Sequence, residues 1–192
     1  MARPKEFDQE AALRSAILAF SRKGFAATST DDLMEAMNIG RQSMYDSFGD
    51  KRTLFLKALE FYSRENVSAI VTELRKPGSP LANIRNALTQ FTERKDLSDG
   101  KGCMGVNAIC EFGLTDHEVL LAMQDAGMLL RQVLLQTLRR AKAEGELPAN
   151  ADITSLADFI DVTLSGLRVA AKAGKGRAAL RRIVEIAAKA IV

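Results

Sequence analysis

Hydrophobic residues recur along this chain at helical spacing, and every element that the pattern predicts is a helix. The first amphipathic stripe consists of Ala12, Leu13, Ala16, Ile17 and Phe20. Helices are expected at residues 8–23, 30–37, 41–48, 51–76, 80–97, 103–113, 115–144, 152–173 and 177–191, with a polar loop at 98–102. No segment alternates polar and apolar residues with β-branched enrichment, so the expected fold class is all-α.

Caps and glycines set the helix boundaries. Asp8 can cap the first helix, and Gly24 can take the left-handed conformation at its end. Ser29 followed by Asp32 resembles a capping box, and Thr115 followed by Glu118 predicts another.

Two short helices near the N-terminus have a helix-turn-helix layout. Residues 30–37 and 41–48 are separated by the turn Asn38-Ile39-Gly40. The apolar positions that would lock the two helices together are Leu33, Met37, Ile39, Met44 and Phe48. The other face of the second helix is polar, with Arg41, Gln42, Ser43, Tyr45, Asp46 and Ser47. Such a face can read base edges and hold phosphates in a DNA major groove.

The segment KGFAATSTDDLMEAMNIGRQSMYDSFGDKRTLF resembles the DNA-binding segment of the TetR/AcrR family of bacterial transcriptional regulators. The matching positions are Gly24-Phe25, Thr28-Ser29, Asp32-Leu33, Ile39, Ser43-Met44-Tyr45, Phe48, Lys51 and Leu54-Phe55. The resemblance implies a three-helix DNA-binding domain at residues 1–50 and a larger helical ligand-binding and dimerisation domain at 51–192. It also implies a homodimer, a palindromic double-stranded operator and a small-molecule or electrophile effector.

Residue by residue, the resemblance places Arg41, Gln42 and Ser43 over base edges. Arg41 suits guanine and Gln42 suits adenine. The residues expected to hold phosphates are Ser29, Thr30, Tyr45 and Lys51, and Ser47 lies on the same polar face. Asp46 departs from the neutral or basic residue expected there, and it either accepts from a cytosine amine or repels the DNA backbone.

A second group of candidate residues lies in the helix at 103–113. Cys103, Asn107 and Glu111 share one face, and Cys110 lies about 10.5 Å along the axis from Cys103, too far for a disulfide between them. The group resembles a cysteine-containing subgroup of the family that senses electrophiles or oxidants. A thiol at a helix N-terminus favours the thiolate. The alternative is that Cys103 is a small core residue and Asn107 a satisfied buried amide.

Apolar residues after Cys103 predict either a ligand cavity or plain core. These residues are Met104, Phe112, Leu120, Met123, Met128 and Leu130, of which Phe112 and Met123 are assigned to the sensing site. The last two helices offer the expected dimer interface: Leu156, Phe159, Ile160, Thr163, Leu164, Leu167, Leu180, Ile183, Val184 and Ala187. Residues 168–192 carry seven basic residues and one acidic residue, so binding to an acidic partner or membrane surface is the alternative for the last helix.

Composition and charge indicate which classes of protein remain. The chain has 192 residues, a formal net charge of +3 and 47% hydrophobic residues, typical of a globular protein. Its longest stretch without a charged residue is 102–110, too short for a membrane span, and the N-terminus does not resemble a secretory signal, so a cytoplasmic location is expected. His117 is the single histidine, so we expect no metal, cofactor or catalytic centre. The alternatives are a helical small-molecule-binding protein or enzyme, and an activator in place of a repressor.

Overall fold

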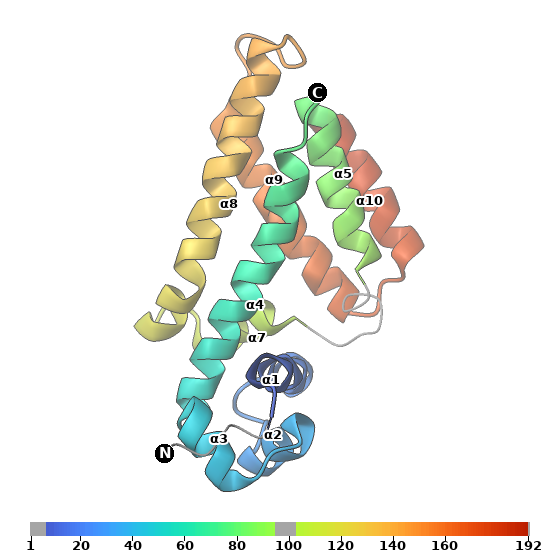
Figure 1. Cartoon of the computed structure of the whole chain (residues 1–192). Helices are drawn as coiled ribbons and strands as arrows, with labels where there is room; N and C mark the ends of the chain where they lie inside the picture. Colours follow the sequence, from blue (N-terminus) through green and yellow to red (C-terminus); the bar gives the residue numbers. More distant parts are fainter. Residues whose placement is uncertain (1–6, 95–102, 192) are drawn as a thin grey trace. The chain divides into compact units, whose positions relative to one another are not determined.

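The computed structural model describes residues 7–94 and 103–191, and every regular element in these ranges is an α-helix (Figure 1). The helices are α1 Gln9–Lys23, α2 Thr30–Met37, α3 Arg41–Phe48, α4 Lys51–Leu74, α5 Pro80–Glu93, α7 Met104–Phe112, α8 His117–Ala143, α9 Ile153–Lys172 and α10 Arg177–Ala190. The all-α prediction is confirmed. The end of the helix expected at 80–97 and the loop expected at 98–102 lie outside the described residues.

Side-chain caps begin several helices where the sequence predicts them. The Asp8 carboxylate accepts from the Glu10 and Ala11 amides, and Ser29 and Asp32 form the reciprocal capping box of α2. The box predicted for Thr115 and Glu118 is wrong. Asp116 caps α8 by accepting from the Val119 amide, whereas the Thr115 hydroxyl donates to the Phe112 carbonyl and Glu118 binds Arg52.

The chain forms two compact units, and each is discontinuous in sequence. The described residues among 1–63 and 104–123 make the first unit, and those among 64–103 and 124–191 make the second. Consequently α4 and α8 each contribute residues to both units.

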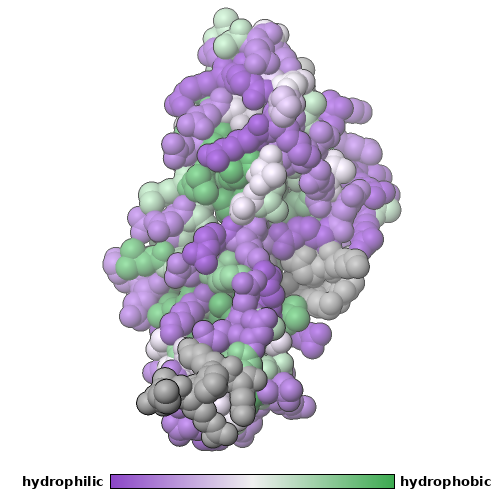
Figure 2. Space-filling view, in the orientation of Figure 1, coloured by the Kyte–Doolittle hydropathy of each residue, from purple (hydrophilic) through white to green (hydrophobic). Residues whose placement is uncertain are grey.

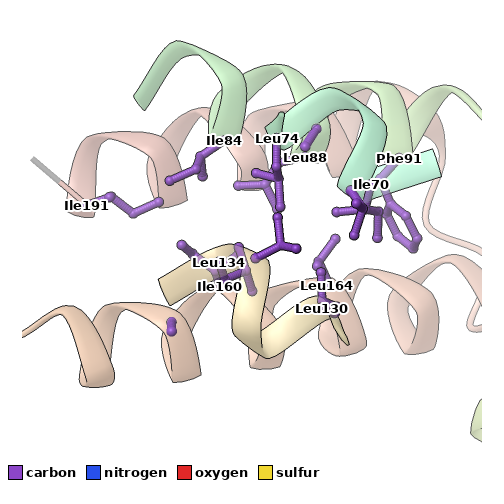
Figure 3. Packing of buried hydrophobic residues seen from close by; sticks show 14 of the residues in the cluster. Ile70, Leu74, Ile84, Leu88, Phe91, Leu130, Leu134, Ile160, Leu164 and Ile191 are labelled. Carbon is purple, nitrogen blue, oxygen red and sulfur yellow. The ribbon is translucent and has the colours of Figure 1, made fainter. Parts of the chain in front are cut away.

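The core of the second unit is mostly aliphatic. Side chains from α4, α5, α8, α9 and the end of the chain point toward one another in it (Figure 3), among them Leu74, Ile84, Leu134, Ile160 and Leu164. Each of these five is at most 2% exposed. α10 packs against both α5 and α9, which closes this core.

The core of the first unit is rich in aromatic rings. Phe20 of α1 and Phe55 of α4 meet edge to face with centroids 5.1 Å apart, and Phe25 and Phe112 pack against Phe55 at 5.0 and 5.6 Å. Met104 of α7 is also fully buried here. The helix that begins beside Cys103 therefore completes the core of the N-terminal helices.

The face shown in Figure 2 is largely hydrophilic, with separate hydrophobic patches. Among the described residues, no helix combines the length and the apolar character that a membrane span requires.

Candidate nucleic-acid interface

The N-terminal helices form a helix-turn-helix with a tight turn. Asn38 takes the left-handed conformation at φ 52° and ψ 46°, which ends α2 and lets the Ile39 amide donate to the Met34 carbonyl. Leu33 and Met44 are fully buried between the two helices, and Met37 and Phe48 are nearly so. The apolar side of α3 is therefore anchored, and its opposite side is left for solvent.

The polar residues of α3 lie on that solvent side. Arg41, Gln42, Tyr45 and Asp46 are exposed, with Tyr45 at 42%, and Ser43 and Ser47 are half-buried at the edges (the helix lies at the lower end of the view in Figure 1). An exposed aromatic ring beside a guanidinium and an amide can contact both the backbone and the base edges of DNA.

Two of these side chains are held by neighbouring carboxylates. Arg41 Nη2 lies 3.0 Å from Asp31 Oδ1, and the Gln42 amide donates to Asp46 Oδ1 at 2.8 Å. Asp46 thus orients Gln42 one turn away on the same helix. Any group that binds the Arg41 and Gln42 donors therefore has to compete with these two carboxylates.

The residues expected at phosphates begin or precede a helix. The Ser29 hydroxyl caps α2 and donates to Asp32 Oδ2 at 2.8 Å, and half-buried Thr30 is the first residue of α2. Lys23, 2.7 Å from Asp32, together with Ser29 holds the pKa of Asp32 well below its usual range. Lys51, the first residue of α4, places its ammonium 4.3 Å from the centre of the Phe25 ring.

Residues of α7 contact the end of α1 and the turn that follows it. The buried Asn107 amide donates to the carbonyls of Phe20 at 3.1 Å and Ser21 at 2.9 Å. The Glu111 carboxylate accepts from the amides of Phe25 at 2.9 Å and Ala26 at 2.8 Å. Asn107 is thus a satisfied buried amide, and Glu111 has a role that sequence reasoning missed.

Gly24 is the one sequence signal that could have pointed to the Glu111 contact. It has φ +81°, and a Cβ at this position would lie 1.9 Å from Glu111 Oε1. Glycine is therefore required twice, for its backbone conformation and for the approach of the carboxylate.

Arg52 joins the first turns of α4 and α8. Its Nη2 lies 2.6 Å from Asp116 Oδ1 and 3.0 Å from Glu118 Oε2, and its guanidinium lies over the Phe112 ring at 5.4 Å. Asp116 raises the pKa of Arg52, and Arg52 in turn lowers the pKa of Asp116. The sequence analysis did not identify these three residues as a group.

The residues predicted to sense an effector occupy different environments. Cys103 is buried at 1% exposed, Cys110 is exposed on α7, and the two are not joined in a disulfide. Phe112 and Met123 pack against the core of the first unit. His117 is exposed at the start of α8, and the described part of the chain contains no group of three side chains suited to a metal.

The candidate cavity-lining residues divide between the two cores. Met104 belongs to the first, Leu130 to the second, and Met128 is 54% exposed. A groove of about 410 Å³ opens elsewhere on the second unit, near the start of α9, lined in part by Leu147, Leu156, Phe159 and Ile191.

The predicted dimer residues are mostly covered within one chain. The buried members are Ile160, Leu164, Leu167, Leu180, Val184 and Ala187. Phe159 and Ile183 are 39% and 38% exposed, and Leu156 and Thr163 are half-buried. Three apolar residues that the sequence analysis did not select are more exposed: Val162 at 68%, Val169 at 53% and Ile186 at 69%. On α9 and α10, therefore, only the exposed apolar residues offer surface that a second copy of the chain could cover.

Two family models match the chain. Residues 12–58 match the bacterial regulatory proteins of the tetR family, and residues 79–187 match the tetracyclin repressor-like C-terminal domain. The first match covers the helix-turn-helix, and the second covers more than half of the chain.

Related proteins agree with these matches over nearly the whole length. An uncharacterized HTH-type transcriptional regulator, YezE of Bacillus subtilis, is 33% identical over 90% of each chain, and the HTH-type transcriptional repressor ComR of Escherichia coli is 29% identical over 96% of this chain and 88% of its own. A cysteine mutant of the TetR family regulator CifR, solved with 26-bp double-strand operator DNA, is 31% identical with a TM-score of 0.78, covering 98% of this chain and 99% of its own. The chain therefore belongs to the TetR family of bacterial transcriptional regulators.

Proposed function

We propose that this protein is a cytoplasmic homodimeric repressor, not an enzyme, that binds a palindromic double-stranded operator through α3 and leaves it when an effector binds. The observation that carries the proposal is the exposed polar face of α3 on a helix whose other face is buried. The relatives ComR and BdcR of Escherichia coli, named as repressors, and the CifR complex with operator DNA support it.

The proposed reading surface has two parts. Arg41, Gln42 and Ser43 at the start of α3 read base edges, with Asp46 and Ser47 beside them. The phosphates are held by Ser29, Thr30, Tyr45 and Lys51. Because Asp31 and Asp46 lie within hydrogen-bond distance of Arg41 and Gln42, the free surface has little net attraction for arbitrary DNA, and specific contacts supply most of the selectivity.

The proposed dimer uses the exposed apolar face of α9 and α10. Phe159, Val162 and Val169 recur at helical spacing, and Gly166 lies between the last two with nothing within 4 Å of its Cβ position. Ile183 and Ile186 extend the face onto α10. Two copies related by a two-fold axis would bury these residues in a four-helix arrangement, and the operator would share that symmetry.

The proposed effector domain is residues 51–192, with residues 1–50 as the DNA-binding domain. We infer an electrophile or oxidant as the signal from the place of Cys103 at the start of α7; the thiol is 1% exposed, so it reacts only when this end of α7 opens, and an added group would then keep α7 displaced. The sensing set comprises Cys103, Asn107, Cys110, Glu111, Phe112 and Met123. Cys103→Ser should keep operator binding and lose the response to an electrophile; an unchanged response would assign Cys103 to the core alone.

The experiment that tests the proposal is fluorescence anisotropy on DNA from upstream of the protein's own gene, beside a scrambled duplex, at two salt concentrations. We expect the wild-type protein to bind its upstream DNA selectively and Tyr45→Ala to lose this binding. Sedimentation should show that the dimer of the variant is intact. Tyr45→Phe keeps the ring and removes the hydroxyl, so its affinity shows which of the two contributes to binding. Equal binding by Tyr45→Ala and wild type would remove α3 from its assigned role, and transcription from the same DNA distinguishes a repressor from an activator.

A further inference from the structure

The geometry points to a positioning function for the corner formed by residues 107–118, which runs from α7 into the first turn of α8. This corner holds the DNA-reading segment, residues 29–51, at both of its ends and thereby sets operator affinity. This inference rests on the proposed function. All residues that it uses belong to the first compact unit, and the nine proposed DNA-contact residues lie within residues 29–51.

The first anchor lies just before that segment. Glu111 binds the amides of Phe25 and Ala26, four and three residues upstream of the Ser29 cap of α2. Asn107, one turn earlier on α7, binds two carbonyls in the last turn of α1. Thus α7 supplies a carboxylate for two amides of the turn and an amide for two carbonyls of the last turn of α1, where the Phe20 carbonyl also accepts from the Gly24 amide.

The second anchor lies just after the segment. Arg52 follows Lys51 directly and binds Asp116, the cap of α8, and Glu118 in the first turn of that helix. The two anchors come from one continuous corner, residues 107–118, so a displacement of this corner acts on both ends of residues 29–51 together.

These contacts suit positioning better than simple stabilisation. Glu111 and Glu118 are exposed, and exposed charged contacts add little to the free energy of unfolding. Hydrogen bonds are directional, however, and base reading requires donors placed to a fraction of an ångström.

Charge makes the inference testable, because the removal of a carboxylate raises the net charge and by itself favours binding to DNA. Glu111→Ala and Glu118→Gln should lower affinity for the selected duplex, Glu111→Ala about tenfold or more through loss of two charge-assisted hydrogen bonds. Affinity for the scrambled duplex should stay equal or rise. Glu111→Gln keeps one acceptor oxygen and should show an intermediate loss, and it also serves if Glu111→Ala does not fold.

Glu10→Gln is the matched control. Glu10 is an exposed carboxylate in the first turn of α1 that pairs with Arg14, and it lies about 20 Å along the helix from the turn. The Glu10→Gln variant changes the net charge by the same amount as the Glu111 and Glu118 variants and should leave selective binding unchanged.

A second readout separates positioning from folding. Amide hydrogen exchange at Phe25 and Ala26 should accelerate in Glu111→Ala, while the thermal midpoint changes little. Unchanged selective affinity in the Glu111 variants, or equal loss of selective and non-selective binding in step with unfolding, would overturn the inference. Failure of the wild-type protein to select any duplex would instead reject the proposed function.

Discussion

The two compact units of this protein are stabilised by different kinds of contact. Seven of the nine phenylalanines belong to the first unit, where rings meet at defined angles. The second unit buries mostly leucine, isoleucine, valine and alanine, with Phe91 as the aromatic member of its core cluster. Ring packing depends on orientation, whereas aliphatic burial depends mainly on area.

This difference matches what the proposed function asks of each unit. A DNA-reading head must hold its side chains in one geometry, which directional contacts achieve. The second unit contains most of the proposed effector domain, which must accept a change, and aliphatic cores tolerate repacking when their volume is kept. The comparison makes four predictions, ordered by expected effect.

The largest effect is expected from Phe55→Ala. Phe55 is 1% exposed and contacts three other rings, so its loss should cost about 3–5 kcal/mol of unfolding free energy and abolish operator binding. Urea denaturation followed by circular dichroism measures it. Phe91→Ala is the matched variant in the second unit. A cost below about 1 kcal/mol for Phe55→Ala would contradict the idea that the ring cluster stabilises the head.

Gly24→Ala should separate backbone strain from the Glu111 contact. Gly24 and Gly145 both have positive φ, +81° and +77°, and Gly24 combines it with ψ −178°, so alanine should cost about 1–3 kcal/mol through backbone strain at either site. Only at Gly24 does the new methyl also displace Glu111, whereas the Cβ position of Gly145 has nothing within 4 Å. Gly24→Ala should therefore lower operator affinity and Gly145→Ala should not, as measured by anisotropy, with thermal melts to report the backbone strain at each site. Equal effects at both sites would show that Glu111 yields without consequence.

Leu134→Met should be nearly silent. Leu134 is 1% exposed in the aliphatic core, and methionine keeps the volume while adding flexibility, so the cost should be below about 1.5 kcal/mol with operator affinity unchanged. Chemical denaturation provides the test. A loss of several kcal/mol would mean that the second unit is packed as specifically as the first.

The smallest expected effect is the dependence of the thermal midpoint on pH in acid. Hydrogen bonds lower the pKa of Asp32, Asp50 and Asp116 in the first unit, with Lys23, the Thr53 amide and Arg52 as the leading partners. In the second unit Ser155 and neighbouring amides do the same for Asp152. A depressed pKa in the folded state adds stability above the unfolded value of about 4, and this is lost as the pH falls below it.

The thermal midpoint should therefore decline below about pH 4, and Asp32→Asn should weaken that decline while lowering the midpoint slightly at pH 7. Melts from pH 7 to 2.5 measure both. If the decline of the thermal midpoint below about pH 4 were the same in Asp32→Asn, other carboxylates would be responsible for it.

The sequence by itself determined the helices and the helix-turn-helix. Caps such as Asp8 and Ser29 act within three residues, and apolar periodicity is a property of one helix, so both can be predicted without knowledge of neighbours. Even the error at Thr115 was a shift of one residue, and Asp116 caps α8 by the same mechanism. The polar face of α3 followed from the same local pattern, and its contacts with DNA stay a prediction.

Only the tertiary structure decided which helix covers which face. Periodicity marks Ile160 and Val184 as apolar-face residues but does not say whether their own chain or a partner covers them, and here their own chain does. In the same way, Asn107 and Glu111 share a helical face in the sequence, yet their partners lie more than 80 residues away at the end of α1. Contacts at that separation depend on how the helices pack, because no local propensity links the two positions.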